Sequence, residues 1–151
     1  MTAVVEIEAG SKPWPSSSIS IVTARGLMTP VVRDVGDKTV DEVAAELRAL
    51  GEKAENGRLK LDEYEGGGFT VSNLGMFGVS EFTAIINPPH AGILAVGAAE
   101  PRVIARDGAP VVATMLTCTL STDHRVVDGA DAAKFLNALK QLLENPEELA
   151  P

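Results

Sequence analysis

A predicted hairpin whose second arm is a long strand constrains the fold of this chain more than any other feature. Asp107-Gly108 is typical of a two-residue hairpin turn. Strand-forming residues flank it, from Val103 to Ala105 on one side and from Val111 to Ser121 on the other. The second arm is longer than an average strand of roughly 5–6 residues. We therefore expect a sheet that residues 111–121 cross from one edge to the other.

Shorter segments have the patterns of further strands. Ser18–Thr23 alternates polar and apolar residues, as half-buried strands do, and Phe69–Leu74 is also strand-like. Gly92–Gly97 is continuously apolar, which indicates a buried strand. Met28–Val32 is a further extended piece, with Pro30 marking it as an edge. Val4–Glu8 could form another short strand.

Two helices are expected. Thr39 and Glu42 fit a capping box, in which each side chain satisfies a free backbone amide at the start of the helix. Apolar residues follow at helical spacing as far as Asn56-Gly57, a typical stop. A final helix follows Asp128-Gly129 and ends at Asn145-Pro146. Helices packed against one face of a mixed or antiparallel sheet give an α+β fold with two layers.

Length and composition indicate one globular domain. The chain has 151 residues, of which 45% are hydrophobic, and this excludes a disordered chain. Prolines and serines between Gly10 and Ser17 break any regular structure. We therefore divide the chain into an N-terminal extension or linker, residues 1–17, and a domain over residues 18–151.

Charge and cysteine content exclude several classes of function. The net charge is −8 and there is no basic cluster, so we expect neither nucleic acid nor a membrane as a partner. Cys118 is the only cysteine, which excludes an internal disulfide and a cysteine zinc site, and we expect no metal. The first ten residues have two glutamates and no Lys or Arg, unlike a signal or transit peptide. We expect a cytoplasmic protein.

Imidazole chemistry could use only His90 or His124. His90 follows two prolines, with no acid or nucleophile close in sequence, and this favours a turn or surface histidine. His124 follows the long strand, and Asp123 and Asp128 flank it. An acid near an imidazole can fix its tautomer and raise its basicity. Alone, however, His-x-x-x-Asp-Gly is a weak motif.

Structural roles compete with chemical roles at these positions. Asp123 and Asp128 could pair with Arg125 or cap the final helix. Ser72 lies in a Ser-Asn-x-Gly segment, where a serine often caps its own backbone. Cys118 lies mid-strand among apolar neighbours and is expected to be an inert buried thiol.

Three runs that occur in order carry a specific family resemblance. They are FTVSNLGMFG at 69–78, AIINPPHAGILAVG at 84–97 and DHRVVDG at 123–129, and GLMTPVV at 26–32 adds to them. From about Ser18 to Pro146 the chain resembles the catalytic domain of dihydrolipoyl acyltransferases, the core components of 2-oxo acid dehydrogenase complexes. The amino-acid sequences of these runs are most similar to those of the pyruvate branch, the dihydrolipoyl acetyltransferases.

This resemblance implies a fold like that of chloramphenicol acetyltransferase, with trimers whose active sites lie between subunits. It implies transfer of an acetyl group between dihydrolipoamide and coenzyme A, with acetyl-CoA as a substrate and the lipoyl group carried by another chain. The implied partners are a homotrimer or larger symmetric core, lipoyl domains and the other subunits of a 2-oxo acid dehydrogenase complex. The residues that bind coenzyme A stay unassigned.

The resemblance also implies roles for three side chains. A thiol with a pKa near 8.5 is only slightly ionised at pH 7, so a base is needed, and imidazole suits that task. His124 matches the catalytic histidine of the family. Ser72 matches the hydroxyl that stabilises the tetrahedral oxyanion. Asp128 matches the motif aspartate, which we interpret as holding the local geometry.

The chain also departs from the family. The N-terminal half of the catalytic domain, the lipoyl domain and the peripheral-subunit-binding domain have no counterpart in it, and His90 stands where the family usually has glutamine. Two hypotheses follow: a minimal acetyltransferase, or a non-catalytic protein, which is either a core or assembly component or a truncated relic. An antibiotic acetyltransferase on the same fold is disfavoured by the residues around His124.

Overall fold

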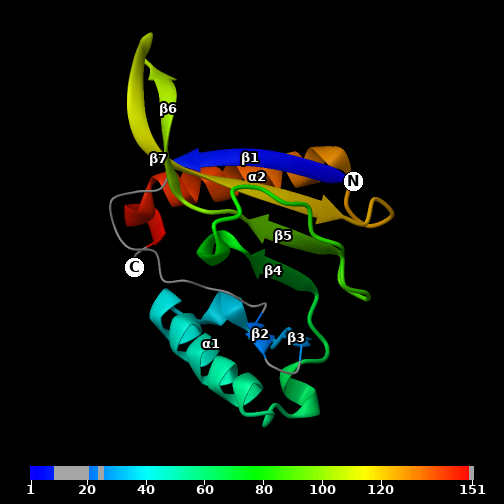
Figure 1. Cartoon of the computed structure of the whole chain (residues 1–151). Helices are drawn as coiled ribbons and strands as arrows, with labels where there is room; N and C mark the ends of the chain where they lie inside the picture. Colours follow the sequence, from blue (N-terminus) through cyan, green and yellow to red (C-terminus); the bar gives the residue numbers. More distant parts are fainter. Residues whose placement is uncertain (9–20, 24–25, 150–151) are drawn as a thin grey trace.

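A computed structural model describes residues 1–8, 21–23 and 26–149 (Figure 1). The expected linker at Gly10–Ser17 and the first part of the expected strand at Ser18–Thr23 lie outside the described residues. Besides the strands and α-helices given below, there are short 3-10 helices at Val35–Asp37, Leu61–Glu63, Gly75–Phe77 and Pro146–Leu149.

The long strand is confirmed as the centre of the main sheet. Strand β7, Ala109–Thr122, has 14 residues and pairs with three other strands. Its first half forms an antiparallel hairpin with β6, Glu100–Arg106, and this hairpin projects beyond the rest of the sheet (Figure 1). Asp107 and Gly108 both have positive φ, 52° and 79°. The two left-handed residues make the turn that the sequence predicts.

The second half of β7 lies between two strands. On one side, β1, Thr2–Glu8, pairs with it antiparallel, with Thr2 opposite Ser121. On the other side, β5, Gly92–Val96, is antiparallel to β7, and β4, Phe69–Asn73, is parallel to β5. The order is therefore β1-β7-β5-β4. Part of the segment expected to be an extension thus forms a strand of the main sheet.

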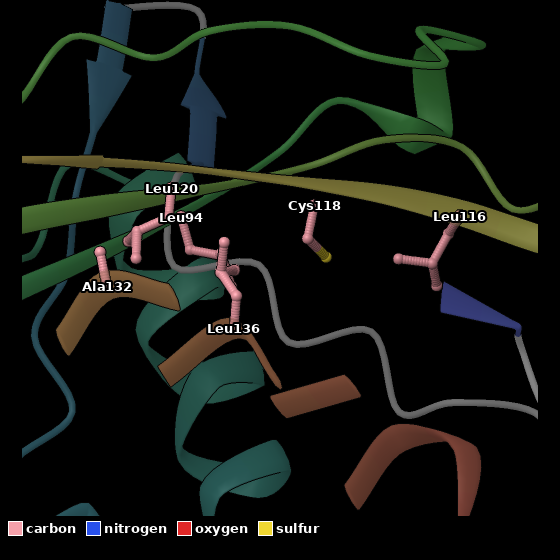
Figure 2. Packing of buried hydrophobic residues seen from close by; sticks show 6 residues of the cluster. All are labelled: Leu94, Leu116, Cys118, Leu120, Ala132 and Leu136. Carbon is pink, nitrogen blue, oxygen red and sulfur yellow. The ribbon is translucent and has the colours of Figure 1, made fainter. Parts of the chain in front are cut away.

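One face of this sheet is covered by helix α2, Gly129–Glu144. In Figure 2, apolar side chains of β5 and β7 point toward α2 and pack against residues of the helix. The buried cluster consists of Leu94, Leu116, Cys118, Leu120, Ala132 and Leu136. Because successive side chains of a strand alternate between faces, Thr117, Thr119 and Ser121 lie on the opposite face. The two-layer α+β prediction is confirmed, with α2 as the helical layer.

The other helix is placed differently from the prediction. Helix α1, Val40–Glu55, lies with β2, Ile21–Thr23, and β3, Gly26–Met28, beyond β4 and not on the face that α2 covers (Figure 1). Its start is as predicted, because Thr39 and Glu42 form both bonds of the capping box.

The expected extended segment at Met28–Val32 forms a strand only at Met28, in β3. Pro30 has no amide to donate to a ladder. The amide of Val31 instead donates to the carbonyl oxygen of Glu63, 2.8 Å away, so the chain is attached to the short helix at Leu61–Glu63. Among the described residues, no helix is both long enough and apolar enough to cross a bilayer.

Candidate active site

His124 lies in a tight turn between the end of β7 and the start of α2. The amides of Val126 and Val127 both donate to the carbonyl oxygen of Asp123, at 2.9 and 3.0 Å. On the other side, the amide of Asp123 donates to the carbonyl oxygen of Ala91 at 3.0 Å, which continues the β5–β7 ladder beyond its last residue. The turn is therefore held to the sheet while the side chain of His124 is exposed.

Asp123 is engaged by Arg125. The Arg125 Nε donates to Asp123 Oδ1 at 2.9 Å, and Nη2 lies 2.6 Å from Oδ2. These side-chain bonds, with a further bond from the Arg125 amide, lower the pKa of Asp123 to about 2. Asp123 is thus ionised at neutral pH and paired with Arg125. This pairing is one of the structural roles that the sequence predicted for Asp123.

Asp128 caps the final helix. It is the N-cap residue of α2, and its Oδ1 accepts from the amide of Asp131 at 2.9 Å. No hydrogen bond or ion pair joins the imidazole of His124 to another group in the part of the chain that the structure describes. Asp128 therefore fixes the end of the turn through the helix, which agrees with a role in local geometry.

Ser72 lies near the end of β4, level with Ala95 on β5 and, through it, with Thr119 on β7. It is half-buried on the face opposite α2. The alternative that Ser72 caps its own backbone is wrong, because Asn73 does so: its Oδ1 accepts from the amide of Gly75 at 2.8 Å. Among the described residues, no partner engages the hydroxyl of Ser72, which can therefore donate to a bound group.

One copy of the chain keeps Ser72 and His124 apart. Ser72 is level with Thr119, whereas His124 follows the end of β7 at Thr122. Three residues along a strand span about 10 Å, and the two strand spacings between β4 and β7 add about 10 Å across the sheet. The turn after β7 and the end of β4 lie toward opposite sides of the sheet (Figure 1). A site that uses both side chains requires a second copy.

His90 belongs to a turn, as one of the two alternatives predicted, because its amide donates to the carbonyl oxygen of Asn87 at 3.0 Å, but its side chain is not fully exposed. It is half-buried, and its Nδ1 lies 2.6 Å from the hydroxyl oxygen of Thr70 at the start of β4. Twenty residues separate the two in the chain. No local sequence pattern could therefore predict the contact between His90 and Thr70. The one unusual feature of His90 in the sequence was that it stands where the family usually has glutamine.

Cys118 is confirmed as a buried thiol. Its exposed fraction is 1%, and burial raises its pKa to about 11. It belongs to the cluster between the sheet and α2 (Figure 2). Both properties keep the thiol neutral and inaccessible, so it is unsuited to act as a nucleophile.

A surface pocket lies between α1 and the short helix at Leu61–Glu63, and neither Ser72 nor His124 lines it. Its volume is about 250 Å³. Lys53 in its lining pairs with Glu63, and Arg33 donates to two backbone carbonyl oxygens, so these charged groups are already engaged. Within the described residues, no group of three His, Cys, Asp or Glu side chains could hold a metal ion.

Comparison with known proteins decides the family. The model of the 2-oxoacid dehydrogenases acyltransferase (catalytic domain) family matches residues 16–150. The chain belongs to this family. It is 48% identical over 128 residues to the dihydrolipoyllysine-residue acetyltransferase component of the pyruvate dehydrogenase complex of Rhizobium meliloti, which covers 85% of this chain and 29% of that protein. It is 50% identical over 135 residues to the mitochondrial component of Schizosaccharomyces pombe, covering 87% and 28%.

Solved structures of acyltransferase cores have the same fold. The structure of Azotobacter vinelandii dihydrolipoamide acetyltransferase matches with a TM-score of 0.82 and 36% identity, covering 97% of this chain and 56% of that one. A probable dihydrolipoamide acetyltransferase of Listeria monocytogenes matches with a TM-score of 0.80 and 35% identity, covering 95% and 57%. The chain therefore spans about three tenths of the length of these curated relatives and a little over half of the solved cores.

Proposed function

We propose that this acyltransferase moves an acetyl group between coenzyme A and dihydrolipoamide, with His124 as general base and Ser72 as donor to the oxyanion. The lipoyl group is carried by another chain of a 2-oxo acid dehydrogenase complex, in the cytoplasm. The observation that carries the proposal is the state of His124. Its imidazole is exposed, has no partner among the described residues, and lies on a turn that is bonded to the sheet at one end and to α2 at the other.

The chemistry requires a proton to move twice. His124 takes the proton from the attacking thiol, and the sulfur then forms a bond to the carbonyl carbon of the thioester. When the tetrahedral intermediate collapses, the carbon–sulfur bond to the leaving thiol breaks and the imidazolium returns the proton to that sulfur. Because donor and acceptor are both thiols, one imidazole serves both directions of the reaction.

Ser72 fits the second task because its hydroxyl has no partner in the described part of the chain and lies on a strand that is paired with β5. A positioned donor to an oxyanion contributes roughly 3–4 kcal/mol to catalysis. The Azotobacter vinelandii enzyme was studied for the roles of a serine, a histidine and an asparagine in its catalytic mechanism. Its serine and histidine have the same sequence separation as Ser72 and His124, and its asparagine follows the histidine by the same four residues as Asp128. This agreement supports the three assignments.

The separation of Ser72 and His124 supports an oligomer whose active sites lie between copies of the chain. We propose that copies of the chain assemble into a homotrimer or a larger symmetric core. Lipoyl domains and other subunits of the complex bind to this core. One structural neighbour, with a TM-score of 0.82, is the cubic core of a pyruvate dehydrogenase multienzyme complex. A closed symmetric core satisfies the requirement that each site draws side chains from two copies.

The second candidate function is a non-catalytic core component. Positioning of the substrates supplies much of the rate of such a reaction, and the chain matches a little over half of a solved core, so the presence of His124 and Ser72 does not by itself ensure turnover. The two candidates differ in one property: the enzyme turns over acetyl-CoA and the scaffold does not.

The test is acetyl transfer from acetyl-CoA to free dihydrolipoamide by the purified chain. We expect turnover, a loss of about 10²–10⁴-fold in His124→Ala, and no loss in Asn137→Ala, an exposed control on α2. Circular dichroism establishes that each variant is folded. A folded wild-type chain without turnover would overturn the enzyme and leave the scaffold.

A further inference from the structure

His90 sits where the start of β4 meets the turn at residues 87–91. Its Nδ1 and the hydroxyl of Thr70 share a hydrogen bond of 2.6 Å, and Thr70 is only 2% exposed. A hydrogen bond between half-buried and buried partners is costly to break, because the partner left behind has no water to replace it.

The other side of the imidazole is packed against backbone. A Cβ placed on Gly67 would lie 2.9 Å from His90 Nε2 and 3.3 Å from a methyl group of Val31. The ring therefore fills the space that a side chain at position 67 would need. Thr70 on one side and Gly67 on the other hold the imidazole in one orientation.

The residue after His90 reaches the catalytic turn. The amide of Ala91 donates to the carbonyl oxygen of Gly68 at 3.1 Å, and its own carbonyl oxygen accepts from the amide of Asp123 at 3.0 Å. Asp123 directly precedes His124. A continuous set of contacts thus runs from Thr70 through the His90 ring and the Ala91 backbone to the residue beside the proposed base.

The same contacts reach the other proposed catalytic residue. Thr70 and Ser72 are two residues apart on β4, so their side chains lie on one face of the sheet. His90 is thereby connected to the strand that carries Ser72 and to the turn that carries His124.

We propose that His90 is a positioning residue for acetyl transfer, which fixes the turn of His124 by holding residues 87–91 against the start of β4. The inference rests on the proposed function for its kinetic part. In this role His90 acts through the turn and not on the reacting atoms. Its effect is on the position of the base, where a displacement of about 1 Å can lower the rate about 10²-fold.

The kinetic test uses variants that remove or retain one hydrogen bond. Thr70→Val and His90→Leu remove it, whereas His90→Asn keeps a polar atom near the position of Nδ1. We expect kcat to fall at least about tenfold in the first two, with KM for both substrates changed less than about twofold. His90→Asn should recover most of kcat, and Thr70→Val/His90→Leu should be no slower than either single variant.

A second measurement does not depend on activity. Hydrogen exchange at the Asp123 amide reports its bond to Ala91, and the Leu120 amide inside β7 is the internal control. We expect His90→Leu and Thr70→Val to accelerate exchange at Asp123 at least about tenfold and leave Leu120 unchanged. If His90→Leu does not fold, Thr70→Val removes the same bond and carries both tests.

The outcomes separate the two proposals. A folded wild-type chain without acetyl transfer overturns the proposed function, and the exchange at Asp123 still decides whether His90 holds the turn. Variants that lower the melting temperature but keep wild-type kcat and wild-type exchange at Asp123 overturn the role of His90.

Discussion

Ser72 and His124 lie toward opposite ends of the sheet, because each is near the carboxyl end of its own strand and β4 runs opposite to β7. Ser72 is level with Thr119, and His124 comes two residues after the end of β7 at Thr122. Both side chains are free of partners in the described part of the chain, as groups that act on a substrate must be. In the proposed enzyme, each copy therefore supplies Ser72 to one site and His124 to another.

Removal of the Ser72 hydroxyl should slow the chemical step and leave substrate binding nearly unchanged. Ser72→Ala is expected to lower kcat about 10²–10³-fold, because the oxyanion exists only after the thiol has attacked. Steady-state kinetics with both substrates measures the effect. If KM rose by the same 10²–10³-fold while kcat stayed constant, Ser72 would instead be assigned to ground-state binding.

Asp128 should matter for stability through its cap on α2. Asp128→Ala leaves the Asp131 amide without its acceptor and should lower the free energy of unfolding by about 0.5–2 kcal/mol. Asp128→Asn retains an acceptor oxygen and should cost much less, since asparagine is an equally good N-cap. Urea denaturation of the three proteins provides the comparison. Equal loss in both variants would show that the charge, not the cap, stabilises the helix.

The pair of Asp123 and Arg125 should make stability depend on pH in the acid range. The pKa of Asp123 is lower in the folded chain, about 2, than its ordinary value of 3.8. The folded state therefore binds the proton less readily, and the stabilisation is present above pH 4 and lost as the pH falls toward 2. The stability difference between wild type and Arg125→Ala should shrink over that interval in urea titrations. A difference that stays constant from pH 5 to pH 2 would contradict the assignment.

Cys118 should be unreactive in the folded chain. A thiol reagent such as 5,5′-dithiobis(2-nitrobenzoic acid) at pH 8 should release no colour from the native protein over minutes and one equivalent after denaturation. The thiol is 1% exposed, and its pKa of about 11 keeps the reactive thiolate scarce. Rapid labelling of the native protein would show that α2 opens readily from the sheet.

Local features of this fold were predictable from local sequence. Asp107 and Gly108 form the hairpin turn because both tolerate left-handed backbone, and Thr39 with Glu42 makes the capping box within four residues. Asp128 was one of two residues considered for a helix cap, and it has that role. Each of these outcomes depends on residues that are neighbours in the chain.

What the sequence did not reveal depends on register and on distant contacts. The opposite placement of Ser72 and His124 follows from which residues of β4, β5 and β7 lie level, and tertiary packing decides that register. The contact of Thr70 with His90 depends in the same way on how the turn at 87–91 folds back on β4. Family resemblance identified the chemical residues and implied sites between subunits, and the register of the sheet adds a physical reason, because one copy keeps the two side chains apart.

Mixing two inactive variants tests the shared site most directly. His124→Ala and Ser72→Ala, refolded together in equal amounts, should recover about a quarter of wild-type acetyl transfer, because each site draws each side chain at random from the two variants. Each variant refolded alone is the control and should stay inactive. Recovery would establish that Ser72 and His124 act across an interface. No recovery from a mixture shown to contain mixed oligomers would contradict the account.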